Sequence, residues 1–520
     1  MGLCLVGLLV SLAGWAHAQV SPAVAARQWR ELNERSVLDE LVELLRIPNT
    51  GQDAAAMRRN ADAIVRMLAR RGVRARLLEV EGAPPIVYGE RLRRGARQTL
   101  LFYGHYDGRP VNPSEWNTGD PFRPTLMSDS IEAGGQPIPL PRPGWPSDPE
   151  WRLYARSASD AKSSVVALAC ALEALDSRYV AIPSNLKFVF EGEKESMSQH
   201  LAATLKAHPE LLRGDVWFVM DGAVHPNRQQ QLAFGLRGLV RLDITVYGAR
   251  YPLPGRQYAD WAPNPTLVLS QLIASLKTPD GKVAVEGFYN GIVPLGEAEL
   301  RAIDEAPDYA ASLRRELWLS DSVAAGRLEK ALNEPALSIG ALKAGAADEA
   351  GHGMIPSSAT ASLDVWLVKG MDHIATVERI LAHFRKQGFI VTETEPGEEV
   401  RARHAYVCKV SRRAGFNAGH VSLDSDLSQH VIRAVEQARG PVIKLPVVAA
   451  DLPVHHLQRT LNAPAIIVPI ANHDGNAHGP NENIRLQNLW DGIETMAALI
   501  ALDEPEPASR SRPGRRTPAR

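Results

Sequence analysis

The sequence predicts an α/β protein with a mostly parallel sheet covered by helices, interrupted by an inserted α+β domain. Three observations support this fold class. The chain has 520 residues, which is more than one hydrophobic core usually holds. Strand-like and helical patterns alternate over about the first 235 residues, as in sheets whose parallel strands are connected by helices. After that point, strands with alternating apolar and polar residues begin.

The first part of the chain contains most of the predicted sheet. Helical periodicity extends over 21–71 and stops at Gly72, where a glycine commonly ends a helix. Residues 109–150 are rich in Pro, Gly and Asp, and a loop of this length is usually functional or mobile. The remaining elements are strands over 75–80, 85–90, 99–107, 186–193 and 216–222, and a helix over 162–179.

The middle of the chain, 236–390, is predicted to be the inserted domain. Its expected elements are strands over 239–249 and 359–370, helices over 262–278 and 374–388, and a long polar helical stretch over 296–333. The chain then returns to the first domain, which comprises 19–235 and 391–503. There we expect a helix over 428–440, a strand over 463–469 and a last helix over 486–503.

Residues 1–18 have the features of a signal peptide. A short apolar stretch is followed by Ala16-His17-Ala18, a small-x-small cleavage site before Gln19. The apolar stretch is shorter than the about 20 residues that a membrane span needs. We therefore expect export to the periplasm or the extracellular space, with no membrane span after signal removal. The alternatives are a misplaced start codon and a short membrane anchor.

Composition narrows the remaining possibilities. The chain is 45% hydrophobic and 22% charged, as in globular proteins. A net charge of -1 gives no sign of the basic face that a nucleic-acid partner would require. Residues 504–520 are rich in Pro and Arg, which favours a disordered tail. Outside the signal segment, the sequence leaves open one disulfide between Cys170 and Cys408 or two separate thiols.

Five potential metal ligands are spread over most of the chain, and four of them follow an apolar, strand-like run. Ligands collect outside the carboxyl ends of strands in an open α/β sheet. Two imidazoles and three carboxylates fit a pair of borderline metals, most simply zinc, and so favour a hydrolase that activates water. Asp107 could orient a ligand histidine two residues before it. The five are His105, Asp160, Glu195, Asp221 and His478.

Each of these residues also has an ordinary structural interpretation. Asp160 immediately precedes a helix, where it could be an N-cap. Glu195 and Asp221 could be polar residues that end a strand, and His478 could be a loop histidine. Only the order and the sequence context of all five together favour a metal site.

The segments around these residues resemble the two-zinc peptidases that include carnosinase, glutamate carboxypeptidase, aminoacylase and succinyl-diaminopimelate desuccinylase. The similarity extends from about residue 30 to 500, with the segments in the family's order. GLRGLVRLDITVYGA followed by APNPT resembles the start of that family's lid domain. The site segments are GHYDGRPV (family GHYDVxPV), RSASDAKSS (RGASDDKG), FEGEKESMSQHL (FEGEEEAGSPHL) and NAHGPNE (NAHSPNE).

The resemblance implies a zinc-peptidase catalytic domain with an inserted lid or dimerisation domain. It assigns Asp160 as the bridge between two divalent metal ions, most simply Zn²⁺. His105 and Asp221 would complete one metal, Glu195 and His478 the other, and Asp107 would orient His105. The implied function is an exported peptidase or dipeptidase that cleaves amide bonds in a small peptide or N-acyl amino acid, and a homodimer is left open.

Several positions depart from the family pattern. Lys194 stands where the family has its general base, and Glu193 is not expected to replace it because neighbouring residues of a strand point to opposite faces. Pro254 replaces the histidine that relatives extend across a dimer, and Trp366 replaces the arginine that grips the substrate carboxylate. Met197 replaces a glycine. The alternative function is therefore a metal-binding homologue with lost or altered hydrolytic activity.

Overall fold

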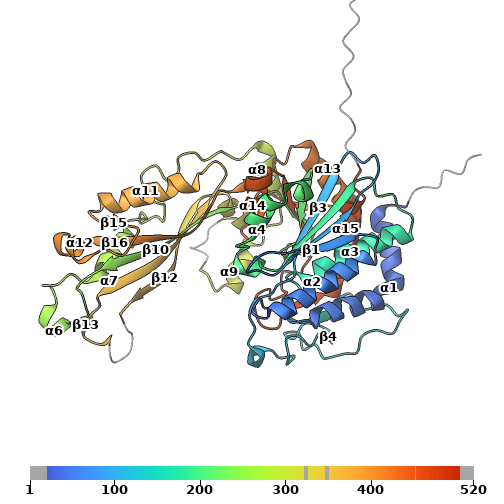
Figure 1. Cartoon of the computed structure of the whole chain (residues 1–520), viewed down its shortest axis with the longest axis horizontal. Coiled ribbons are helices and arrows are strands. Elements are labelled where there is room, and N and C mark those ends of the chain that lie inside the picture. The colour runs from blue at the N-terminus through green and yellow to red at the C-terminus, as the bar shows by residue number, and fades with distance from the viewer. Residues whose placement is uncertain (1–19, 321–325, 346–350, 451, 504–520) are drawn as a thin grey trace, which may run out of the picture.

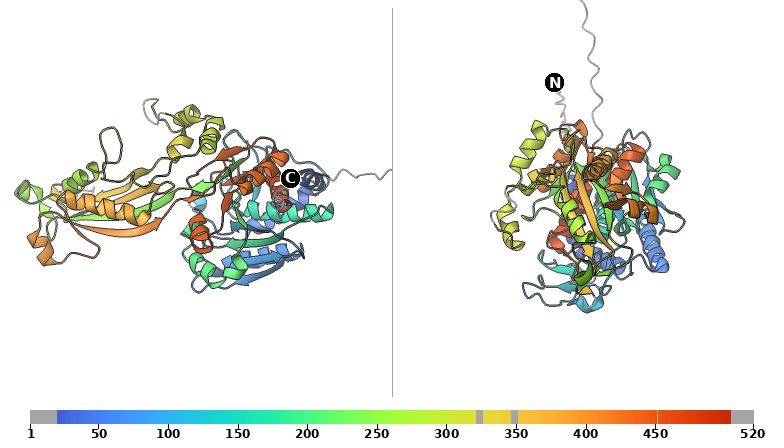
Figure 2. Two further views of the ribbon diagram at one scale, coloured as in Figure 1. Left: turned by 90° about the horizontal axis from the view of Figure 1, so that it is seen from above. Right: turned by 90° about the vertical axis from the view of Figure 1, so that its left-hand side faces the viewer.

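The computed structural model describes residues 20–320, 326–345, 351–450 and 452–503. It forms an elongated molecule in which a smaller unit extends from one side of a larger unit (Figure 1). Figure 2 shows the same separation from above. The predicted signal peptide, its cleavage site and the predicted tail lie outside the described residues. Within them, no helix is both long and apolar enough to cross a membrane.

The larger unit is built on a mixed sheet with eight strands in the described part of the chain. Its central strands β6, β3, β7 and β19 are mutually parallel, and its antiparallel pairs involve β1, β2 and β8, so the predicted mostly parallel sheet is confirmed. In sheet order, the strands are β1 (Arg74–Leu78), β2 (Ile86–Arg91), β6 (Asn185–Glu191), β3 (Thr99–His105), β7 (Val216–Val219), β19 (Ala465–Ile467), β8 (Gln231–Ala233) and β18 (Ile443–Leu445).

Helices cover both faces of this sheet. Alternate residues of β3 are buried on opposite sides, since successive side chains of a strand point to opposite faces. Phe102 packs under α3 and α15, while Tyr103 belongs to the core on the other face, with α4 and α14. The helices are α1 (Pro22–Leu45), α2 (Ala54–Ala69), α3 (Lys162–Ser177), α4 (Leu201–Ala207), α5 (Pro209–Leu212), α13 (Asp426–Arg439), α14 (Val454–Leu461) and α15 (Leu486–Ile500).

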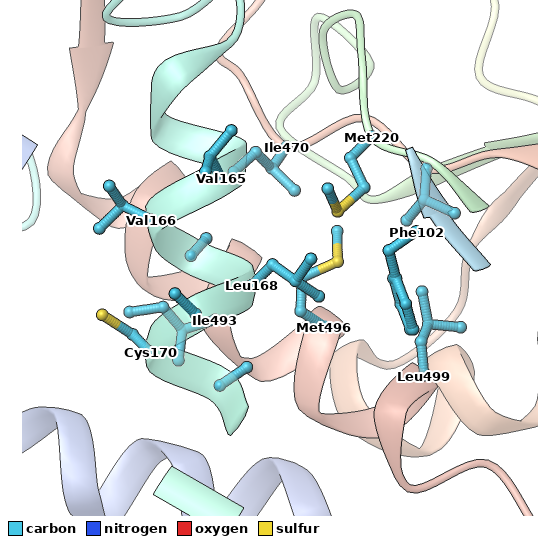
Figure 3. Close-up of a cluster of buried hydrophobic side chains, with 14 of the residues drawn as sticks. Phe102, Val165, Val166, Leu168, Cys170, Met220, Ile470, Ile493, Met496 and Leu499 are labelled. Carbon is cyan, nitrogen blue, oxygen red and sulfur yellow. The ribbon is translucent and has the colours of Figure 1, made fainter. Parts of the chain in front are cut away.

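The core between α3, α15 and the sheet consists of buried apolar side chains. Figure 3 shows side chains of α3 and α15 meeting Phe102 of β3 and Met220, which follows β7. All of the labelled side chains are buried. This packing fixes the strand ends and the start of α3 relative to each other, which is what a multi-strand site requires.

The smaller unit contains a five-stranded sheet in the described residues. β10 lies at its centre and pairs antiparallel with β14 and β16. The burial of β14 alternates residue by residue, as the amphipathic pattern predicts. Its elements are β10 (Gly238–Tyr247), β12 (Ala336–Ala344), β14 (Ser358–Leu367), β15 (Ile390–Thr392) and β16 (Val407–Phe416), with α6 (Gly255–Tyr258), α7 (Pro265–Ala274), α11 (His373–Lys386) and α12 (Glu398–Arg403).

Two expectations for the middle of the chain need correction. The sheet of the smaller unit continues to Phe416, beyond the boundary expected at residue 390, because β16 pairs with β10 along most of its length. The stretch 296–333 is not one long helix. Its described residues form three short helices, and the first of them places Ala302 and Ala306 in the cores of the larger unit. The three are α8 (Glu297–Glu305), α9 (Ala310–Glu316) and α10 (Leu328–Leu332).

Short elements complete the structure. Two paired strands, β9 and β17, lie where the chain passes between the units, and a three-stranded sheet organises the long loop after β3. Cys170 lies in the larger unit and Cys408 in the smaller one, and both are buried free thiols, so no disulfide joins them. The short elements are β4 (Thr125–Met127), β5 (Arg152–Tyr154), β9 (Gly235–Leu236), β11 (Leu253–Pro254), β13 (Met354–Ile355), β17 (Gly419–His420), β20 (Asn483–Arg485), η1 (Pro113–Glu115) and η2 (Lys194–Ser196).

Candidate metal centre

Three neighbouring strands bring candidate ligands to the same edge of the larger sheet. His105 is the last residue of β3, and Asp221 lies just after β7. Glu195 lies in η2, shortly after β6. Because β6, β3 and β7 are adjacent and parallel, their carboxyl ends meet at one edge. The sequence expectation that these three residues converge agrees with the geometry.

Asp160 reaches the same edge from the turn before α3. It is not the N-cap of that helix, because Ala161 occupies the N-cap position and no side chain caps the helix there. Its backbone is held by the buried Glu482, whose carboxylate accepts hydrogen bonds from the backbone N–H groups of Ser157, Ser159 and Asp160 at 2.8, 3.0 and 2.9 Å. Asp160 is therefore free to direct both carboxylate oxygens into the site.

The ligands form two groups that share Asp160. Within each group, one ligand atom per residue lies within 4.8 Å of the others. Asp160 Oδ1 lies 2.8 Å from His105 Nε2, and Asp160 Oδ2 lies 2.8 Å from His478 Nε2. One oxygen of Asp160 thus faces each group, as a bridging carboxylate requires. The groups are His105–Asp160–Asp221 and Asp160–Glu195–His478.

This donor set fits two divalent cations. Each group offers one imidazole nitrogen and carboxylate oxygens from two residues, which are ligands that zinc accepts. A catalytic zinc site typically has three protein ligands and keeps a fourth position for water or substrate. Residues His105, Asp160 and Asp221 would hold one cation, and Asp160, Glu195 and His478 the other.

Asp107 contacts one residue of each group. Its Oδ1 lies 3.0 Å from His105 Nδ1, so that ring nitrogen can donate to it and leave Nε2 facing the site. Its Oδ2 accepts a hydrogen bond from the backbone N–H of Glu195 at 2.7 Å. Asp107 therefore orients a histidine of one group and the backbone of a carboxylate in the other.

Lys194 extends its ammonium group into the centre. Nζ lies 2.9 Å from Glu195 Oε1, 3.2 Å from Asp221 Oδ2 and 3.4 Å from Asp160 Oδ1. Burial opposes the charged form, but the surrounding carboxylates raise the pKa of Lys194 above its ordinary value. The base position of the resembled family thus holds a cation that is paired with three of the five candidate ligands.

The other titratable groups respond to the same charges. Hydrogen bonds to Asp160 and Glu195 raise the pKa of His478 to about 9. Burial acts to raise the pKa of Glu195, but His478 and Lys194 outweigh it and lower that pKa to about 2. Burial raises the pKa of Asp221. The centre is therefore a dense set of opposite charges, held together by their mutual attraction.

Sequence reasoning missed three residues that organise the centre. Arg109 pairs through Nε with Glu195 Oε2. Glu482 holds the backbone of Asp160, and Asp474 anchors the loop that carries His478 by accepting from Arg152 at 2.7 Å. The signal for Glu482 was present in the NAHGPNE segment, which resembles a family motif, whereas no pattern distinguishes Arg109 from an ordinary loop arginine.

The strand-alternation argument against Glu193 as a substitute base needs correction. β6 ends at Glu191, so strand alternation does not apply at Glu193. Its carboxylate instead lies 2.8 Å from His200 Nδ1 and accepts from the His200 backbone N–H at 3.0 Å. Glu193 thus closes the loop around η2 rather than entering the site.

Pro254 and Trp366 lie apart from this group of residues. Pro254 is in β11, which pairs with β13 at the end of the smaller unit that lies far from the larger unit (Figure 1). Trp366 is in β14, where the guanidinium of Arg237 lies 5.7 Å from its ring centroid. Within the described part of the chain, neither side chain forms a hydrogen bond, an ion pair or a ring contact with the candidate ligands.

Comparisons with known proteins identify the family that this chain matches. Residues 101–502 match the model of Peptidase family M20/M25/M40. Cys-Gly metallodipeptidase dug1 of Schizosaccharomyces pombe is 22% identical over 425 residues, covering 80% of this chain and 82% of the relative. Beta-Ala-His dipeptidase of Homo sapiens is 24% identical over 427 residues, covering 80% and 77%. The M20 family metallo-carboxypeptidase Sso-CP2 from Sulfolobus solfataricus has a TM-score of 0.74 at 24% identity, covering 90% of this chain and 98% of that chain.

Proposed function

The chain belongs to Peptidase family M20/M25/M40, and from that premise we propose that it is an exported dipeptidase that depends on two divalent metal ions. One observation carries the proposal: the two ligand groups share Asp160, with one carboxylate oxygen facing each group. The names of two relatives, a metallodipeptidase and a dipeptidase, support dipeptides as the substrate class.

Each residue of the centre then has a defined task. Two dications held there would supply polarisation of the scissile carbonyl and acidification of water near neutral pH. His105 and Asp221 would hold one cation, Glu195 and His478 would hold the other, and Asp160 would contribute an oxygen to each group. Asp107 keeps Nδ1 of His105 protonated. The donor set favours zinc, since imidazole and carboxylate ligands in groups of three suit that ion.

Lys194 favours a second candidate function. A buried ammonium group that contacts three carboxylates cannot accept a proton from water. The protein could therefore bind metal without rapid hydrolysis of ordinary dipeptides. In that case it is a metal-binding homologue with lost or altered hydrolytic activity.

One experiment separates these candidates. Metal content is measured on the purified full chain by mass spectrometry, and hydrolysis of a dipeptide and N-acyl amino acid panel is measured on the same sample. We expect about two transition-metal ions per chain and slow but metal-dependent hydrolysis. Bound metal without turnover on the whole panel would favour the second candidate, and absence of bound metal would contradict both.

Export is a separate part of the proposal, supported by the signal-like segment before Gln19. N-terminal sequencing of the protein from its native host tests it. We expect a mature chain that begins at Gln19, in the periplasm or outside the cell. A cytoplasmic chain that begins at Met1 would contradict export and leave the enzymatic proposal untouched.

A further inference from the structure

Two cations of this chain converge on the same carboxylate. Lys194 Nζ contacts Oε1 of Glu195, and Arg109 Nε contacts Oε2. Glu195 is almost fully buried, with a side chain that is only 5% exposed. A candidate metal ligand therefore has both oxygens engaged by positive side chains of the protein itself.

The two cations differ in their surroundings. The side chain of Lys194 is 6% exposed and lies among ligands of both groups. The side chain of Arg109 is 41% exposed and approaches Glu195 from the start of the long loop after β3. One cation thus lies inside the centre and the other at its margin, on opposite oxygens of one carboxylate.

Metal binding at the Asp160–Glu195–His478 group would use oxygens that these cations contact. A dication attracts a carboxylate about twice as strongly as a single positive charge at the same distance, and it repels an ammonium group. A buried charge that loses its partner is costly unless another partner replaces it. Loading with metal therefore leaves the buried Lys194 in need of a new anion close to the reacting centre, and the partly exposed Arg109 lies where it can bind the same anion.

We propose that Lys194 and Arg109 form a carboxylate-binding site for the substrate in the metal-loaded protein. The inference rests on the proposed function and narrows its substrate class. Because Lys194 contacts the candidate ligands directly, the carboxylate must lie within about one residue of the scissile amide. Dipeptides, N-acyl amino acids and the last amide bond of longer peptides meet this condition through the C-terminal carboxylate, whereas peptides with an amidated C-terminus do not.

The two side chains are suited to this task in complementary ways. The planar guanidinium of Arg109 can present two N–H groups to one carboxylate, and the ammonium of Lys194 adds a point charge with three donors. Charge-assisted hydrogen bonds of this kind are stronger than neutral ones. The position that lost its proton-accepting carboxylate is thus converted into a position that holds an anion.

The test compares two ligands that have no peptide bond, 3-phenylpropanoate and its neutral amide. Calorimetry measures their binding to the zinc-loaded full chain, to Lys194→Met and to Arg109→Met. The control variant is Arg142→Met, which removes an exposed arginine from the same loop. Metal content is measured on every sample, because a carboxylate can also bind to the metal ions themselves.

We expect either substitution to weaken binding of the carboxylate about 10- to 100-fold at equal metal content, while the amide and the control change little. Carboxylate affinities that stay within about twofold of wild type in both variants would overturn the inference. In that outcome the metal ions alone hold the anion, and the proposed function stands. A wild-type chain that takes up no metal would overturn the proposed function, and this inference with it.

Discussion

The two ligand groups of the centre are built in different ways. His105 and Asp221 come from the ends of adjacent strands and are buried, with a His105 side chain that is 0% exposed. Glu195 and His478 come from a short turn and a loop, and the His478 side chain is 42% exposed. His478 also has a backbone φ of 68°, in the left-handed region. The sheet positions the first group, whereas side-chain hydrogen bonds position the second.

This difference is consistent with the positions at which the sequence departs from the family pattern. Residues at the ends of buried strands are constrained by the core that packs around them. Loop residues are constrained only by their own contacts, such as Glu191 with Ser198 and Asp474 with Arg152. The departures at Lys194 and Met197 lie beside Glu195 of the second group in the sequence, and Arg109 contacts its carboxylate. We therefore expect the first group to keep its geometry better than the second group when neighbouring residues are substituted.

The largest expected effect comes from the residue that both groups share. Asp160→Ala removes the only ligand common to the two groups, so we expect loss of both metal ions and of metal-dependent hydrolysis. Metal analysis after dialysis measures this directly, with the exposed Glu132→Ala as control. If Asp160→Ala retained one ion, the two groups would bind metal independently, and Asp160 would not be a ligand that both groups need.

The next effect concerns Lys194, which contacts ligands of both groups. In the proposed mechanism, Lys194→Glu places a carboxylate where a proton must be accepted, and general acid–base assistance is typically worth about 10²–10⁴-fold in rate. We expect kcat for dipeptides to rise within that range and KM to rise as well, because a carboxylate-binding cation is lost. Steady-state kinetics at equal metal content separates the two parameters. Brisk wild-type turnover that falls in Lys194→Glu would show that the lysine has a catalytic role of its own.

Alanine substitution of the two histidines compares the groups directly. His105→Ala leaves a buried gap and removes the partner of Asp107 Oδ1, so we expect it to reduce the free energy of unfolding of the metal-free protein by about 2–4 kcal/mol. His478→Ala removes a partly exposed loop side chain, and we expect less than about 1 kcal/mol. Denaturant unfolding measures both. Equal losses of unfolding free energy would mean that the second group contributes as much to the stability of the metal-free protein as the first group does.

The pH dependence of the free energy of unfolding tests the role of Glu191, which contacts Ser198 in the loop that carries Glu195. Burial raises the pKa of Glu191 to about 7, so the native state favours its protonated form. The resulting stabilisation is complete below the ordinary pKa of 4.5 and is lost as the pH rises through about 7. Glu191→Gln is neutral at every pH. Between about pH 5 and pH 8, we expect unfolding free energy to fall by roughly 2 kcal/mol more in wild type than in this variant. If the free energy of unfolding of wild type and of Glu191→Gln changed equally with pH, the pKa of Glu191 would not be raised in the native state.

The sequence was informative where strands determine the site and less so where loops do. Apolar runs ending in His105 and Asp221 predicted both the strands and the convergence of their ends, because parallel strands share a carboxyl edge. Glu195 and His478 were singled out as potential ligands in the same way, and the resemblance supplied their grouping and the sharing of Asp160. Neither source predicted that Glu482 holds the backbone of Asp160 or that Arg109 contacts Glu195, since those contacts join residues far apart in the chain. The boundary of the smaller unit was misplaced because β16 follows a helix and an irregular stretch.

The smallest effect concerns Met197, which closes the turn that carries Glu195. Its φ of 71° lies in the left-handed region, where a residue with a Cβ is strained and a glycine is not. Met197→Gly should therefore raise the free energy of unfolding by about 0.5–1 kcal/mol, after allowing for the greater freedom of glycine in the unfolded chain. Met197→Ala keeps the Cβ and serves as the matched control, for which we expect no gain. If alanine stabilised the protein as much as glycine did, the partly exposed methionine side chain and not the backbone would be the source of strain. The strain beside Glu195 would then come from the packing of the Met197 side chain and not from the conformation of the backbone.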